Sequence, residues 1–285
     1  MPEFMRACVI GWPIRHSRSP LIHRFWLKEY GVKGDYEKIP VKPEELEEFL
    51  AGLAVNGLRG CNVTIPHKER AYEIVARANS SGVNPMGRRL KAVNTIWLDE
   101  KGRLCADNTD VHGFMANFRQ RQPQWRAKDQ AVTVLGAGGA ARAIVAGFID
   151  AGVKSVTVVN RTGEKALDLA AEMGPPAAAA RLDALPALLE KTDVFVNATS
   201  LGMTGQPPLS VPLEALPAHA IVADIVYAPL QTDLLRAAAR RGLKTVDGLG
   251  MLLHQAAPGF EKWFGPRPEV TRDLRELIER DLEGA

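Results

Sequence analysis

Ala131-Val-Thr-Val-Leu-Gly-Ala-Gly-Gly-Ala-Ala-Arg-Ala143 is the stretch of this sequence that decides its fold. An apolar, β-branched run leads into a glycine-rich turn, and an alanine-rich segment with high helix propensity follows. This order is typical of the first βα turn of a dinucleotide-binding fold, in which the glycines allow close backbone approach and a pyrophosphate lies on the helix N-terminus. A lone Gly-x-Gly is a weak signal, but here the context on both sides is right.

The end of the next predicted strand indicates which dinucleotide is bound. Ser155-Val-Thr-Val-Val159 is expected to be a parallel strand, and Asn160-Arg161-Thr162 follows it. An acidic residue at this place would hold the ribose 2′-hydroxyl of NAD, whereas an arginine attracts a 2′-phosphate. The sequence therefore favours NADP(H), and the alternative is a surface arginine that merely closes the strand.

Composition excludes several classes of protein. The 285 residues are 46% hydrophobic and 24% charged, with a formal net charge of +3 that is not gathered into a basic stripe, so nucleic acid is not an expected partner. No apolar run approaches the roughly eighteen residues of a membrane span, and no secretory signal is recognised. Cys8, Cys61 and Cys105 lack metal-ligand spacing, which favours reduced thiols in a cytoplasmic protein. Met1–Phe4 precede a second methionine and are left outside the fold prediction.

The first half alternates short strands with amphipathic helices. Strands are expected at 7–11, 36–41 and 60–64, and helices at 20–30, 43–53 and 68–78. Val93–Leu98 and Arg103–Ala106 then predict a hairpin, which gives a mainly parallel sheet an antiparallel edge.

The polar segment Gln120–Lys128 is the expected boundary before the Rossmann-like domain. Further strands are predicted at 131–135, 155–159, 194–197, 221–224 and 244–246, a helix at 232–241, and a mere connector at 175–180. Two helices after Gly250 are expected to return to the first sheet. The predicted architecture is α/β, with two α/β domains around a cleft: a substrate-binding domain (1–118), an NADP-binding domain (119–249) and C-terminal helices (250–285).

Polar clusters in the first half fall where strands end, and ligands of open parallel sheets bind at such ends. Their hydroxyls, carboxamides, lysine and aspartate suit a small polyhydroxylated acid. The clusters are Ser17-Arg-Ser19-Pro20, Asn62-Val-Thr64-Ile-Pro66-His-Lys68, Asn94-Thr95 and Asn108-Thr-Asp110. Strand alternation puts Asn62 and Thr64 on one face.

These clusters, in this order, resemble the motifs of the shikimate dehydrogenase family. The second half resembles the same family in its glycine loop, in Asn160-Arg-Thr162, in Asn197-Ala-Thr-Ser-x-Gly-Met203, in Asp224-Ile-Val-Tyr227-x-Pro229, and in Gly250-Met251 through Gln255 to Phe260. The resemblance spans nearly the whole chain, and eight motifs in register are far more specific than any one of them.

The resemblance implies the reversible NADPH-dependent reduction of 3-dehydroshikimate to shikimate, a step in the formation of aromatic amino acids through chorismate. By analogy Ser17, Ser19 and Tyr227 bind the substrate carboxylate, while Thr64, Asn94, Asp110 and Gln255 contact ring hydroxyls or the reacting oxygen; Asn62 is the weakest substrate ligand. Lys68 is the implied acid/base, assisted by Asp110. The implied NADP(H) site comprises Gly136, Ala137, Gly138, Gly139, Ala140, Asn160, Arg161, Thr162, Lys165, Thr199, Ser200, Met203, Ile225, Gly248 and Met251.

An ammonium group suits this chemistry, because hydride transfer to a ketone leaves an alkoxide that needs a proton and a nearby positive charge. A neighbouring carboxylate raises the pKa of a lysine whereas burial lowers it, so Lys68 is open to interpretation as a proton donor or as an electrostatic anchor.

Local structural roles compete with these assignments. Ser19 before Pro20 suits a helix N-cap, and Asp110 suits the cap of the following helix. His16, His67 and His254 lie near the motifs but receive no role. Lys91, Ala106 and Val111 replace glycines that are common in the family, and 79–85 resembles an inserted loop.

Two other functions stay open. One is a paralogue acting on quinate or an amino-shikimate, and the other is a non-catalytic NADPH-binding module, against which the intact Lys68 and Asp110 argue. No cluster of His, Cys and carboxylate residues suggests a metal. The expected partners are small molecules, and the sequence does not distinguish a monomer from a homodimer.

Overall fold

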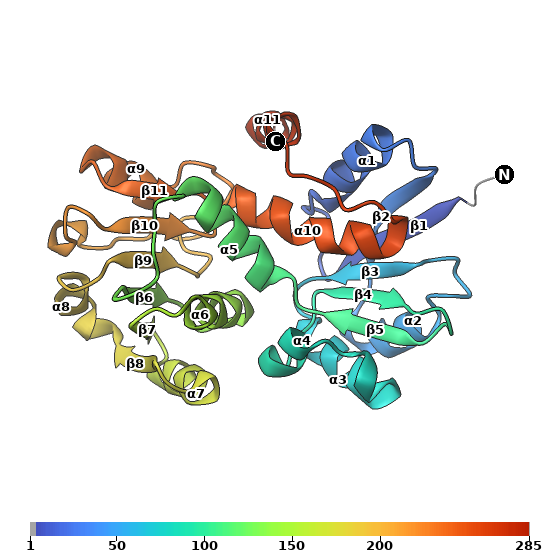
Figure 1. The fold of residues 1–285 in the computed structure, drawn as a ribbon, viewed down its shortest axis with the longest axis horizontal. Helices are drawn as coiled ribbons and strands as arrows, with labels where there is room; N and C mark the ends of the chain where they lie inside the picture. The colour runs from blue at the N-terminus through green and yellow to red at the C-terminus, as the bar shows by residue number, and fades with distance from the viewer. Residues whose placement is uncertain (1–3, 285) are drawn as a thin grey trace. The chain divides into compact units, whose positions relative to one another are not determined.

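The computed structural model describes residues 4–284, so Met1–Glu3 and Ala285 lie outside the described part. The chain divides into two compact units. The first contains the residues up to Thr109 and Leu253–Arg280, and the second contains Asp110–Leu252 and the residues from Asp281. Figure 1 traces the chain through both. None of the helices within residues 4–284 has the length and apolar character that a membrane crossing requires.

The first unit is built on a five-stranded sheet with the order β2-β1-β3-β4-β5. Its strands are β1 (Met5–Gly11), β2 (Gly34–Pro40), β3 (Gly60–Val63), β4 (Thr95–Leu98) and β5 (Leu104–Asp107). β1 runs parallel to both β2 and β3, whereas β4 runs antiparallel to both of its neighbours, β3 and β5. The predicted hairpin at the sheet edge is therefore confirmed.

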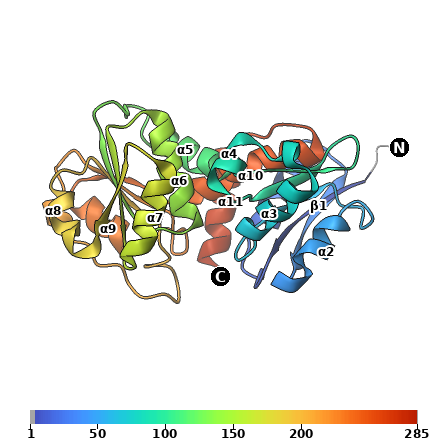
Figure 2. The ribbon, with the colours of Figure 1, turned by 90° about the horizontal axis from the view of Figure 1, so that it is seen from below.

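Helices cover both faces of this sheet (Figures 1 and 2). They are α1 (Ser19–Glu29), α2 (Leu46–Ala51), α3 (Lys68–Ala78) and the short α4 (Pro85–Leu90). On one face, apolar residues of α2 and α3 such as Leu50 and Ile74 pack with Cys8, Ile10 and Val63 of the strands. The helical spacing of these apolar residues is the signal that predicted both helices.

The other face of the sheet is covered by α1 and by α10 (Leu249–Phe264), which brings the end of the chain back to the first unit. The indole N–H of Trp263 donates to the carbonyl of Ile96 at 2.9 Å. Gly60 lies beneath this indole, and a Cβ there would collide with Trp263 and with the Ile96 carbonyl. Trp26 similarly donates to Glu269 at 3.0 Å, just before α11 (Arg272–Glu283).

His23 of α1 lies fully buried among the aromatic side chains between α1, β2 and α10. Its ring stacks on Tyr36 at a centroid distance of 3.9 Å and contacts Trp26, Phe260 and Trp263. Within the described residues neither ring nitrogen has a hydrogen-bond partner. Burial lowers the pKa of His23 to about 3, so the imidazole is neutral in the folded protein at ordinary pH.

This burial predicts a loss of stability in acid. Between pH 6.5 and about 3, the unfolded chain binds a proton at His23 and the folded chain does not, so the free energy of unfolding falls as the pH falls. Relative to His23→Leu, we expect an extra loss of about 2 kcal/mol between pH 7 and pH 5. Urea unfolding at both pH values measures it, with His16→Leu at an exposed position as the control. Equal losses in the wild type and His23→Leu would contradict the prediction.

The second unit holds a six-stranded, entirely parallel sheet with the order β11-β10-β9-β6-β7-β8. Its strands are β6 (Ala131–Leu135), β7 (Ser155–Asn160), β8 (Ala177–Arg181), β9 (Val194–Asn197), β10 (Ile221–Asp224) and β11 (Lys244–Val246). The order reverses between β6 and β9, which makes that point the expected ligand site of a doubly wound sheet. The predicted Rossmann-like fold class is confirmed.

The connector predicted at 175–180 is wrong, because Ala177–Arg181 forms β8 at the edge of this sheet. Alanine has low strand propensity, so the segment carries no strand signal of its own. Its pairing with β7, from Val156↔Ala177 to Asn160↔Arg181, supplies the backbone partners instead.

The remaining helices are α5 (Asp110–Arg121), α6 (Gly139–Ala151), α7 (Gly163–Met173), α8 (Leu185–Leu189) and α9 (Asp233–Arg240), all in the second unit. Phe114 and Phe118 of α5 pack edge-to-face on Phe148 of α6. The border of the compact unit thus falls before α5, whereas the predicted domain border lies after residue 118. The assignment of a substrate-binding and an NADP-binding domain stays a prediction.

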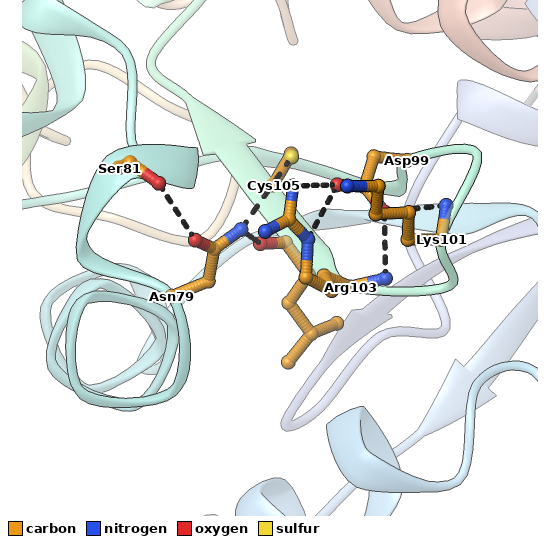
Figure 3. Close-up of polar contacts among 7 residues, drawn as sticks. Asn79, Ser81, Asp99, Lys101, Arg103 and Cys105 are labelled. Carbon is orange, nitrogen blue, oxygen red and sulfur yellow. Dashed lines mark hydrogen bonds and ion pairs between the residues drawn. The ribbon is translucent and has the colours of Figure 1, made fainter.

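The segment 79–85, predicted as an inserted loop, is tied to the β4–β5 hairpin (Figure 3). Asn79 donates from Nδ2 to the carbonyl of Leu104 at 2.9 Å and accepts from the Ser81 hydroxyl at 3.0 Å. At the hairpin turn, Asp99 accepts from the backbone N–H groups of Lys101 and Arg103. The segment is therefore an anchored connection that contains a short 3-10 turn at Ser80–Gly82 and leads into α4.

Lys91 ends α4 with φ of +49°, in the left-handed region that favours glycine. The backbone of this chain thus keeps the conformation that glycine would adopt most easily, although lysine stands there.

Candidate functional site

The turn after β6 has two kinds of glycine. Gly136 has φ of +116°, and an added Cβ would lie 2.9 Å from the carbonyl oxygen of Ala198, so the fold itself requires glycine. At Gly138 and Gly139 an added Cβ would meet no atom within 4 Å. Gly138 is the N-cap residue of α6 and makes no side-chain cap hydrogen bond, and Gly139 is the first residue of the helix. The open backbone at a helix N-terminus fits a pyrophosphate, and Ala137 and Ala140 are the small neighbours in this turn.

The turn after β7 contains Asn160, Arg161 and Thr162. Asn160 donates from Nδ2 to the carbonyl of Thr162 at 2.9 Å, which fixes the turn, and Arg161 is exposed. Lys165 is exposed in the first turn of α7. A pocket of about 480 Å³ opens here, lined by Asn160, Arg161, Gly163, Arg181, Leu182 and Asp183. Sequence reasoning missed Gly163, Arg181, Leu182 and Asp183. Arg181 ends β8, whose segment was taken for a connector, and Leu182 and Asp183 directly follow that strand.

A buried pair at the ends of β9 and β10 holds the next two loops. Asn197 donates from Nδ2 to Asp224 Oδ1 at 2.9 Å, and its own Oδ1 accepts from the Thr199 hydroxyl at 2.7 Å. Asp224 also accepts from the Val226 N–H and from the Thr232 hydroxyl, which caps α9. Burial raises the pKa of the Asp224 carboxyl to about 6, against the effect of these hydrogen bonds.

These anchored loops carry several predicted site residues. Thr199 is half-buried, Ser200 and Met203 are exposed, and the Met203 N–H donates to the Ser200 carbonyl at 3.2 Å. Ile225 and Tyr227 follow Asp224 closely and are half-buried.

Gly248 lies against the β10 loop, at the start of α10. An added Cβ at Gly248 would collide with the backbone carbonyl of Ile225, so these two predicted cofactor residues are in backbone contact. Asp247 accepts from the Leu249 N–H at 3.1 Å and thereby caps α10. Met251 is half-buried in the first turn of that helix.

In the first unit, Asn94 lies at the centre of a buried hydrogen-bond network. Its Oδ1 accepts from the Thr109 N–H at 2.8 Å, from the Thr109 hydroxyl at 3.1 Å and from the Thr95 hydroxyl at 3.1 Å. Its Nδ2 donates to Gln255 Oε1 at 3.4 Å. These contacts fix which end of the amide is the donor, and they bring two predicted substrate residues together.

Asn62 is hydrogen-bonded to the residues of this network. It donates from Nδ2 to the Asn94 carbonyl at 3.0 Å and to the Thr95 hydroxyl at 3.2 Å, and it accepts from the Tyr36 hydroxyl at 2.6 Å. Asn62 is 4% exposed, so its amide ties three strands together. Its substrate contact remains a prediction.

The turn that carries Thr64 and Lys68 is anchored to neighbouring segments. The Thr64 N–H donates to the Ile10 carbonyl at 3.0 Å, and the Lys68 carbonyl accepts from the Val93 N–H at 3.0 Å. Both residues are half-buried, and Lys68 is the first residue of α3. His67 beside them is 1% exposed and bonds through Nε2 to the Val41 carbonyl at 2.8 Å, as a core histidine does.

Ser17 and Ser19 form a pair at the start of α1. The Ser17 hydroxyl donates to Ser19 Oγ at 3.2 Å, and the Ser19 N–H donates to Ser17 Oγ at 3.3 Å. Ser19 is the first helical residue, and Arg18 occupies the N-cap position without a side-chain cap, so the N-cap alternative for Ser19 is wrong. Asp110 is buried and begins α5, directly after Thr109.

No group of three or more His, Cys, Asp or Glu side chains among residues 4–284 is placed to hold a metal ion.

Family models match three segments of the chain. Residues 9–96 match the shikimate dehydrogenase substrate binding domain, residues 119–203 match shikimate/quinate 5-dehydrogenase, and residues 248–277 match the shikimate 5′-dehydrogenase C-terminal domain. The chain is 52% identical over 288 residues to shikimate dehydrogenase (NADP(+)) of Brucella abortus, with 100% of this chain and 97% of the relative covered. It is 51% identical to the protein of the same name from Methylocella silvestris, with 98% of each chain covered.

Solved structures with the same fold include two of direct interest. Shikimate 5-dehydrogenase of Thermus thermophilus, in complex with NADP(H) and shikimate, is 36% identical with a TM-score of 0.82 and 99% coverage of both chains. Quinate dehydrogenase of Corynebacterium glutamicum, in complex with NAD, is 28% identical with a TM-score of 0.88, covering 96% of this chain and 98% of that one.

Proposed function

Since the chain belongs to the shikimate dehydrogenase family, we propose that it is an NADP-dependent oxidoreductase that catalyses the reversible reduction of 3-dehydroshikimate to shikimate. The observation that carries the proposal is the network around Asn94, which fixes the amide groups of Asn94 and Gln255 at the carboxyl end of β3 and next to the β4–β5 hairpin. Preorganised polar groups of this kind suit a ligand with several hydroxyl groups.

NADP(H), when bound, supplies or accepts the hydride. The open backbone of Gly138 and Gly139 supports a pyrophosphate site, and exposed Arg161 supports a contact to the 2′-phosphate. Thr162, Lys165, Thr199, Ser200, Met203, Ile225, Gly248 and Met251 are the further residues that we assign to this cofactor.

The residues of the first unit would bind and orient the substrate. We assign the carboxylate to the linked hydroxyl pair of Ser17 and Ser19, together with Tyr227, and the ring hydroxyls to Thr64, Asn94 and Gln255. Lys68 then donates a proton to the developing alkoxide and stabilises its charge, with Asp110 as the assisting carboxylate. Positioned proton transfer of this kind contributes about 10²–10⁴-fold to a rate.

A paralogue that acts on quinate is the second candidate, and the likeness to an NAD-bound quinate dehydrogenase favours it. Arg161 in place of an acidic residue favours NADP over NAD, which argues against a quinate enzyme that prefers NAD. Initial rates with shikimate and with quinate, each with NADP⁺ and with NAD⁺, test the proposal. The shikimate–NADP⁺ pair is expected to be the best of the four, and a clear preference for quinate with NAD⁺ would overturn the assignment.

Arg161 carries the cofactor prediction. In Arg161→Ala the KM for NADP⁺ should rise about 10- to 100-fold, since a charge-assisted hydrogen bond contributes about 1.5–3 kcal/mol, while the KM for NAD⁺ stays nearly constant. Steady-state kinetics with both cofactors at saturating shikimate measure the change. An equal rise for both cofactors would mean that Arg161 does not contact the 2′-phosphate.

We expect small molecules as the partners and the cytoplasm as the location. Analytical ultracentrifugation determines whether the protein is a monomer or a homodimer.

A further inference from the structure

We propose that Arg181 is a second arginine of the 2′-phosphate site, and that Asp183 competes with the phosphate for it. The inference rests on the proposed use of NADP(H) and adds two residues that set its selectivity. Both lie outside the glycine loop and outside the Asn160–Thr162 turn.

The sheet register brings Arg181 to this place. Asn160 and Arg181 are paired residues at the carboxyl ends of β7 and β8, so Arg181 lies directly beside the turn that carries Arg161. Parallel strands present their carboxyl ends at the same edge of a sheet, where ligands bind. Arg161, Arg181 and Asp183 all line the pocket of about 480 Å³ at this edge.

Arg181 is available for a ligand because its present partner is weak. Its Nε and Nη2 lie 3.2 Å from Asp183 Oδ2, and the two side chains are 84% and 67% exposed. Exposed ion pairs of this kind contribute little to stability. A phosphate group carries about −1.5 to −2 charge at pH 7 and accepts paired hydrogen bonds from a guanidinium, so it is the stronger partner.

Asp183 opposes phosphate binding in two ways. It pairs with the Arg181 guanidinium, and it is the sole carboxylate among the residues that line this pocket. A like charge close to the phosphate raises the free energy of the bound state. Removing the charge of Asp183 should therefore strengthen binding of 2′-phosphorylated ligands only.

Calorimetric titration with adenosine 2′,5′-bisphosphate and with 5′-AMP separates the 2′-phosphate from the rest of the nucleotide. In Arg181→Ala the Kd for the bisphosphate should rise about ten-fold, in line with the loss of one charge-assisted contact, while the Kd for 5′-AMP stays unchanged. In Asp183→Asn the Kd for the bisphosphate should fall several-fold, and this gain should shrink when Arg181→Ala is also present.

Arg236→Ala is the matched control. Arg236 is itself exposed, pairs on α9 with Asp233, an aspartate as exposed as Asp183, and belongs to the β10–β11 edge, at the opposite end of the sheet order from β8. An unchanged bisphosphate Kd in Arg181→Ala, or an equal loss for 5′-AMP, would overturn the inference alone. If the wild-type protein itself did not prefer the bisphosphate to 5′-AMP, the proposed use of NADP(H) would fail, and this inference with it.

Discussion

Replacing Lys68 by alanine is expected to lower kcat for shikimate oxidation by about 10²–10⁴-fold, while the Kd for NADPH changes less than about two-fold. The variant removes the group that we propose as proton donor and acceptor at the reacting oxygen. Lys68 begins α3 with its carbonyl bonded to the Val93 N–H, and this backbone contact survives the substitution. The turn should therefore keep its shape, so that the effect falls on the chemical step.

Steady-state kinetics and NADPH fluorescence titration provide the two measurements. Lys101→Ala, at an exposed lysine in the hairpin turn of the same unit, is the control and should leave both values unchanged. Lys68→Arg distinguishes the two interpretations of the lysine, because arginine keeps the charge but does not release its proton. Recovery of most of the rate in Lys68→Arg would indicate an electrostatic anchor. Normal turnover in Lys68→Ala would refute the assigned mechanism.

Trp263→Ala is expected to reduce the free energy of unfolding by about 3–5 kcal/mol, a large part of the stability of an ordinary domain. Trp263 is fully buried, and its indole N–H donates to the Ile96 carbonyl of β4. The substitution leaves a cavity beside His23, Tyr36 and Phe264, and it removes the indole donor from the buried Ile96 carbonyl.

Urea unfolding followed by far-ultraviolet circular dichroism measures this loss. The matched control is Trp97→Ala, since Trp97 is a half-buried tryptophan of the same sheet whose ring faces the Lys262 ammonium at 5.1 Å. A cation–π contact of this kind contributes about 0.5–1 kcal/mol. A loss below about 1 kcal/mol in Trp263→Ala would show that α10 is not held to the sheet through this side chain.

Much of the fold follows from the spacing of apolar residues in the sequence and from the turn-forming residues between the elements. The predicted strands at 194–197, 221–224 and 244–246 and the helix at 68–78 have the bounds that the structure gives them. Each is an apolar run or an amphipathic repeat, and glycine, proline or polar residues mark its two ends. β8 escaped prediction because its alanines acquire strand conformation only from pairing with β7.

In the candidate site, too, local motifs could be predicted from the sequence, whereas contacts between distant segments could not. Asn94, Asp110 and Lys68 are recognisable because each stands in a short polar motif after an apolar run. That Asn94 Oδ1 accepts from Thr109 depends on the pairing of β4 with β5, which no local pattern specifies. Arg181 was missed for a related reason, since its neighbour in space is Asn160 of another strand.

The return of α10 to the first sheet determines the order in which the two units can fold during synthesis. Nearly all of the second unit is one continuous segment, Asp110–Leu252. The aromatic core of the first unit, in contrast, is complete only when Phe260 and Trp263 have been synthesised. Domains fold as units while the chain emerges from the ribosome. The half of the enzyme that is translated first is therefore the half that finishes folding last, and until then Trp26 of α1 and Tyr36 of β2 lack the aromatic partners that α10 supplies.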